Sequence, residues 1–124
     1  YKIKGVERMA LITDALACAA SDSDKAFDPR VIIEDGVCKL SDRSALAGSI
    51  ATTDRLIRTM VEQVEVPLED AIRMVSETPS KIMNVYDRKG SLAKGKDADI
   101  LILDEALNIR CIWQMGKIIE NTLF

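Results

Sequence analysis

A carboxylate at the end of a short apolar run is the first residue whose type and position suggest chemistry. Residues 9–13 are almost wholly apolar, and Asp14 follows them directly. Such a run is typical of a strand buried on both faces in a parallel sheet, and ligands bind at the carboxyl ends of such strands. An acid at this position would lie where the chemistry of such folds takes place. The alternative is an Asp that only caps the turn or helix after the strand.

A glycine-containing stretch, Leu46-Ala47-Gly48-Ser49, is the second candidate. A Gly flanked by small residues lets the backbone approach a ligand closely, and the N–H groups of such a loop can bind an oxygen atom. The alternative is a tight entry into the next helix, with Ser49 or a following Thr as its cap. The residues themselves favour neither interpretation.

Composition restricts the classes of partner and cofactor. The chain has no histidine, and Cys18, Cys38 and Cys111 are too widely spaced for a zinc motif, so we expect no metal bound by these 124 residues alone. The net charge of −3 argues against nucleic-acid binding, and no apolar run reaches the roughly 20 residues that span a membrane. No signal-peptide pattern is present, which predicts a cytoplasmic protein.

The elements around the two candidates follow from local patterns. Residues 17–30 are small, acidic or turn-forming and predict a surface loop directly after Asp14. Two apolar runs flank Asp35-Gly36, which is a strong hairpin signal. Helical periodicity then extends over residues 50–64, and Pro67 is well placed to open a second helix.

The last part of the chain has a different composition. A connector rich in Gly and Lys leads from residue 87 to residue 99, and the apolar run 100–103 predicts a buried strand. A final hairpin is predicted over residues 109–120. The chain therefore divides into a strand-and-helix part, residues 1–89, and part of a small β domain, residues 90–124.

Four stretches, in this order, resemble the carboxy-terminal third of the N-acetylglucosamine-6-phosphate deacetylase family of the amidohydrolase superfamily. They are Leu11-Ile12-Thr13-Asp14-Ala15, Glu34-Asp35-Gly36-Val37, Leu46-Ala47-Gly48-Ser49 and the run from Gly90 to Asp99. The last is generic to amidohydrolases, whereas Thr-Asp-Ala followed by Leu-Ala-Gly-Ser is more specific to the sugar deacetylases. The resemblance covers essentially the whole chain.

The resemblance implies an α/β fold, the end of a (β/α)₈ barrel followed by strands of a small β-sandwich. Residues 9–13 would form the last barrel strand. The implied reaction is hydrolysis of the N-acetyl group of N-acetylglucosamine 6-phosphate, with a divalent metal such as zinc that activates water. Asp14 would be the general base and acid, and Leu46, Ala47 and Gly48 would contact the amino-sugar phosphate.

The family's metal ligands have no counterpart in this sequence, and the chain begins at Tyr1 rather than Met. We therefore expect a fragment that is inactive alone and, because its strands lack neighbours, a homo-oligomer. Two alternatives stay open. One is another amidohydrolase, of the dihydroorotase or deaminase type, and the other is a metal-free relative that acts as a binding or structural protein.

Overall fold

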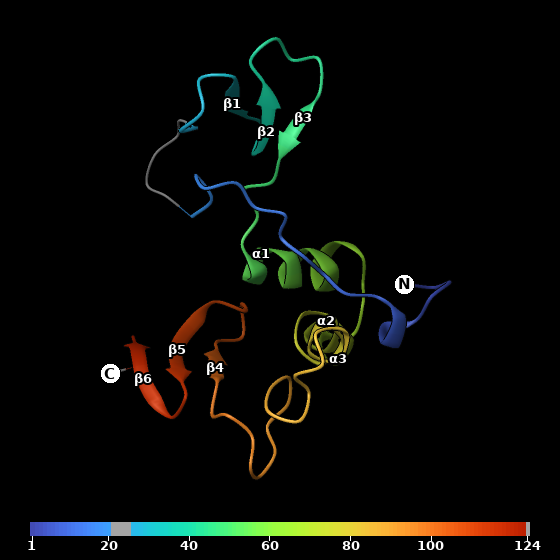
Figure 1. Cartoon of the computed structure of the whole chain (residues 1–124), viewed down its shortest axis with the longest axis vertical. Helices are drawn as coiled ribbons and strands as arrows, with labels where there is room; N and C mark the ends of the chain where they lie inside the picture. The colour runs from blue at the N-terminus through green and yellow to red at the C-terminus, as the bar shows by residue number, and fades with distance from the viewer. Residues whose placement is uncertain (21–25, 124) are drawn as a thin grey trace. The chain divides into compact units, whose positions relative to one another are not determined.

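The computed structural model describes residues 1–20 and 26–123. The chain divides into two compact units, of which the first comprises residues 1–11 and 57–124 and the second residues 12–56. Each unit contains a three-stranded sheet, and both sheets can be followed in Figure 1. The predicted surface loop of residues 17–30 is a turn at residues 17–20, and its residues 21–25 lie outside the described part.

The predicted hairpin is confirmed in the second unit. Strand β1 (Val31–Glu34) pairs antiparallel with β2 (Val37–Leu40). Asp35 and Gly36 form the connecting turn with φ values of 55° and 73°, the left-handed pair that a two-residue hairpin turn requires. A third strand, β3 (Leu46–Gly48), pairs with the other side of β2, so β2 is the central strand.

The segment before Asp14 differs from the expected strand. Met9 is extended, with φ −133° and ψ 122°, but residues 9–14 form no hydrogen-bonded strand. A parallel strand is defined by neighbours on its flanks, and the described residues supply only an isolated parallel bridge between Ala15 and Ser49. The physical reason for the difference is therefore the lack of strand partners among the described residues.

Helices form the middle of the chain, as the periodicity predicts. Helix α1 (Thr53–Arg58) continues into a π-helical turn, η2 (Thr59–Gln63), and α2 (Leu68–Val75) begins directly after Pro67. Helix α3 (Glu77–Ile82) follows at once, and a short 3₁₀ helix, η1 (Val6–Arg8), packs beside α2 and α3. The buried side chains of this region are Ile57, Val66, Ala71, Met74 and Thr78.

The predicted final strands are also present. Strands β4 (Ile100–Leu103), β5 (Ile109–Gln114) and β6 (Lys117–Asn121) form an antiparallel sheet in that order. The expectation that the run 100–103 is buried is wrong, because Leu101 is 53% and Ile102 41% exposed. Among the described strands β4 pairs only with β5, and these two apolar side chains meet solvent.

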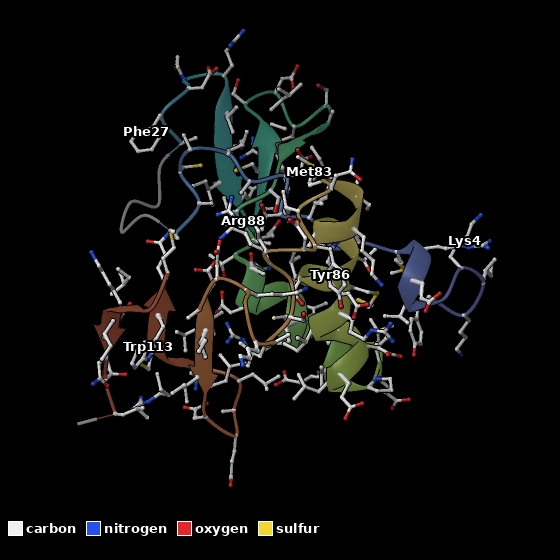
Figure 2. The ribbon with its side chains drawn as sticks, turned by 60° about the horizontal axis from the view of Figure 1, so that its bottom comes forward. Lys4, Phe27, Met83, Tyr86, Arg88 and Trp113 are labelled. Carbon is white, nitrogen blue, oxygen red and sulfur yellow. The ribbon has the colours of Figure 1, made fainter. Side chains whose placement is uncertain are left out.

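The connector before β4 is held by lysines. Lys96 Nζ lies 3.5 Å from the centroid of the Tyr86 ring, which Figure 2 labels, and it donates a hydrogen bond to the Lys89 carbonyl at 3.2 Å. Lys89 in turn pairs with Asp97 at 3.0 Å. Throughout the described residues, no helix has the length and apolarity needed to cross a membrane.

Candidate functional site

Backbone hydrogen bonds bring the two candidate stretches together. The Ser49 N–H donates to the Asp14 carbonyl at 3.3 Å, and the Leu16 N–H donates to the Ser49 carbonyl at 2.8 Å. These bonds frame the parallel bridge between Ala15 and Ser49. Asp14 thus directly precedes the bridge residue Ala15, and Gly48 directly precedes the bridge residue Ser49.

Asp14 has an unusual backbone. Its φ is 47°, in the left-handed region that Asp and Asn adopt more readily than other non-glycine residues. The side chain is exposed, and among the described residues no hydrogen bond or ion pair holds its carboxylate. A carboxylate without a structural partner is available for proton transfer, so capping does not account for this residue within the described chain.

Leu46, Ala47 and Gly48 form strand β3, which differs from both alternatives considered for this stretch, a ligand loop and a helix entry. Gly48 pairs with Cys38 of β2 and has φ 145°, a backbone angle that residues with a side chain rarely adopt. A Cβ atom at Gly48 would lie 2.8 Å from Leu16 Cγ. Glycine is therefore needed here first for close packing against Leu16.

The three residues differ in exposure. Leu46 is 72% exposed, whereas Ala47 and Gly48 are half-buried. Ala47 lines a pocket of about 450 Å³, together with Leu16, Cys18, Leu40 and residues near the end of the predicted loop. Those residues include Phe27, whose ring is 71% exposed and lies at the margin of the unit in Figure 2.

Charges at this pocket come from a neighbouring pair. Arg30 binds Asp28 through two nitrogens, with Nε 3.0 Å from Oδ1 and Nη2 2.6 Å from Oδ2. The side-chain hydrogen bonds from Arg30 hold the pKa of Asp28 at about 2. Asp28 is thus ionised at neutral pH. Its negative charge balances the positive charge of Arg30, so Arg30 is not an unpaired cation at the pocket.

The described residues do not match a divalent metal site. They contain no group of three or more His, Cys, Asp or Glu side chains close enough to hold an ion, and the sequence has no histidine. A metal used by a longer protein would need ligands from outside these 124 residues. We therefore assign no reaction step to a metal on this chain.

The sequence patterns named Ser49 as a possible cap, but they predicted neither its partner nor the role of Leu16 nor the pocket. Leu16 packs against Gly48 and Ser49 bonds the Asp14 segment, and both contacts join positions more than thirty residues apart. Phe27 and Arg30 fell within the predicted surface loop of residues 17–30, but no local pattern indicated that they would line a pocket with Ala47. Contacts of this kind have no signature within a short window.

The comparisons with known proteins agree with one another. The profile of the amidohydrolase family matches residues 5–120. An N-acetylgalactosamine-6-phosphate deacetylase of Escherichia coli O157:H7 is 34% identical and matches 90% of this chain and 30% of its own length. An N-acetylglucosamine-6-phosphate deacetylase of Haemophilus influenzae is 33% identical, with 97% of this chain and 32% of its own length covered.

A solved structure gives the same result for the fold. The crystal structure of N-acetylglucosamine-6-phosphate deacetylase from Pasteurella multocida superposes with a TM-score of 0.88 and 30% identity, over 97% of this chain and 32% of that one. The chain thus spans about a third of the length of these relatives. Its fold is that of a part of these deacetylases, as the sequence predicted.

Proposed function

The chain belongs to the amidohydrolase family, and we propose that it is the carboxy-terminal part of an enzyme that removes the N-acetyl group of N-acetylglucosamine 6-phosphate. The observation that carries the proposal is the pairing of the Asp14 segment with Ser49, next to Leu46, Ala47 and Gly48. This pairing places the Asp14 carboxylate group and Gly48, at the end of β3, next to the bridge between Ala15 and Ser49. The products would be glucosamine 6-phosphate and acetate.

Asp14 is the proton carrier in this proposal. Its carboxylate accepts the proton of the water that attacks the acetyl carbon, and it then returns that proton to the amide nitrogen. An amine leaves readily only when its nitrogen is protonated, so one carboxylate that serves as base and then as acid completes the proton transfers. Its exposure and its lack of a partner among the described residues support this role.

Leu46, Ala47 and Gly48 are the proposed contacts with the sugar. The exposed Leu46 side chain offers apolar surface, and Ala47 faces the pocket of about 450 Å³. Amidohydrolases generally use a divalent metal, and in this proposal its ligands come from residues other than these 124. We place the end of the barrel at residues 1–89 and the small β domain at residues 90–124.

The relatives also support a second substrate. The E. coli protein is named for the N-acetylgalactosamine derivative and the H. influenzae protein for the N-acetylglucosamine derivative, at nearly equal identity to this chain. The two sugars differ only in the configuration of one hydroxyl group. The alternative function is therefore deacetylation of N-acetylgalactosamine 6-phosphate by the same residues.

A chimaera tests the proposal, in which this chain replaces the matching third of the H. influenzae relative. We expect acetate release from N-acetylglucosamine 6-phosphate with metal present, and less from the galactosamine isomer. The 124-residue chain alone, the matched control, should release none. A folded, metal-loaded chimaera that hydrolyses neither sugar phosphate would contradict the proposal, and preference for the galactosamine isomer would select the alternative.

A further inference from the structure

Two cysteines form the centre of the second unit. Among the described residues 12–20 and 26–56, Cys18 and Cys38 are the only buried residues, at 4% and 0% exposure. Their sulfur atoms lie 3.9 Å apart, although the residues are 20 positions apart in the chain. The small interior of this unit is thus built around two facing thiols.

We propose that Cys18 and Cys38 form a reversible dithiol–disulfide pair that fastens the Asp14 segment to strand β2. A disulfide needs its sulfur atoms about 2.05 Å apart. The sulfurs are therefore about 2 Å from bonding distance, a gap of the size that side-chain rotation closes. Cys111 is equally buried, at 3% exposure, but it lies in β5 of the other unit and serves as the internal comparison.

The position of Cys18 supplies a route for an oxidant. Cys18 lines the pocket of about 450 Å³, whereas Cys38 lies in the central strand β2. Burial, and the hydrogen-bond contact with Cys18, raise the pKa of the Cys38 thiol. A raised pKa leaves less of the Cys38 thiolate, which is the reactive form, and of the two cysteines only Cys18 lines the pocket. Cys18 reacts first, and Cys38 completes the bond.

The oxidant in this proposal is a low-molecular-weight disulfide such as oxidised glutathione. The Cys18 thiolate attacks one of its sulfur atoms, forms a mixed disulfide and expels one glutathione thiolate. The Cys38 thiolate then attacks Cys18 Sγ and expels the second glutathione thiolate. The two cysteine protons end on the two released glutathiones, so two protein thiols are oxidised and one small disulfide is reduced.

The bond would connect both parts of the candidate site. Cys18 lies four residues after Asp14, and Cys38 is the β2 partner of Gly48. Leu16, between Asp14 and Cys18, already packs on Gly48. A covalent link across this packing would restrict motion of residues 15–19 relative to β3. The link itself does not depend on the proposed deacetylase function.

The test is thiol mapping of the 124-residue chain in a glutathione redox buffer, with its three cysteines as reporters. After trypsin digestion without reductant, we expect peptide 9–25 joined to peptide 31–39, while the Cys111 peptide stays unlinked. C111S should retain the joined peptides, and C18S should leave Cys38 reduced. Far-UV circular dichroism checks the fold of each variant.

Separate results would overturn separate parts of the proposal. Glutathione adducts on single cysteines, or modification of all three at one rate without the joined peptides, would overturn the pair. The three cysteines can be compared within the wild-type chain even if a variant fails to fold. If the joined peptides form but hydrogen exchange of residues 15–19 is no slower than in the reduced chain, the fastening of the Asp14 segment is overturned.

Discussion

Gly48 has to meet two requirements at once, one for the proposed ligand and one for packing. As a proposed sugar contact it must leave room for ligand, yet it also leaves room for Leu16, whose Cγ would lie 2.8 Å from an added Cβ. Loss of activity in a Gly48 variant therefore does not by itself identify a ligand contact. The packing component has to be measured separately.

We predict that Gly48→Ala lowers the free energy of unfolding by about 1–3 kcal/mol, the usual cost of overpacking. The same substitution in a Leu16→Ala background should cost less, because the crowded side chain is gone, although the strain at φ 145° remains. Urea unfolding of the four proteins measures both values. Equal costs in the two backgrounds would show that Leu16 does not set the requirement for glycine.

At the scale of elements, the β1–β2 hairpin is supported by an ionic cluster. Glu34 Oε2 lies 3.0 Å from Lys39 Nζ, and Glu34 Oε1 lies 3.1 Å from Arg43 Nη2. Lys39 also pairs with Asp35 in the turn at 2.7 Å. The hydrogen bonds from Arg43, followed by those from Lys39, lower the pKa of Glu34 from 4.5 to about 2.

This shift predicts acid sensitivity of the hairpin. A carboxyl group whose pKa is lower in the folded chain stabilises the fold fully above its unfolded pKa, and the stabilisation is lost as pH falls from 4.5 to about 2. Glu34→Gln should therefore lower Tm at pH 6 and have little effect near pH 2. Glu120→Gln, in exposed β6, is the matched control. A pH-independent difference between wild type and Glu34→Gln would contradict the assignment.

Elements governed by local chemistry were predictable, and those governed by distant partners were not. The Asp35-Gly36 turn and the helix start after Pro67 follow from backbone preferences of a few residues, and both are present. Residues 9–13 have the composition of a buried strand but lack neighbours to pair with in the part of the chain that the structure describes. Gly48 was recognised as special, whereas its partners Leu16 and Cys38 and its place in β3 arise from pairing that no short window shows.

At the scale of the whole chain, the exposed apolar surface of the β4–β5–β6 sheet is the feature that most favours association with another copy. Leu101, Ile118 and Ile119 are 53%, 52% and 61% exposed, and β6 is an edge strand with all five residues exposed. Exposed edges and apolar faces favour association.

We predict that the isolated chain self-associates in a concentration-dependent way. Ile119→Lys should reduce the association, because a charge on an edge strand opposes pairing with another copy. Ala106→Lys, an exposed change outside the strands that adds the same single positive charge, is the control. Light scattering across a dilution series measures the mass. A monomer at every concentration would contradict the prediction.

The most direct test of the account concerns the Asp14 carboxylate, measured as kcat of the chimaera with and without Asp14→Asn. Asn tolerates the left-handed backbone at φ 47° and nearly matches Asp as a cap, but it cannot carry a proton. The proton-carrier role predicts a loss of about 10²–10⁴-fold in kcat, with metal content and Tm unchanged. A folded, metal-loaded Asp14→Asn chimaera that turns over within a few-fold of its parent would remove Asp14 from the mechanism.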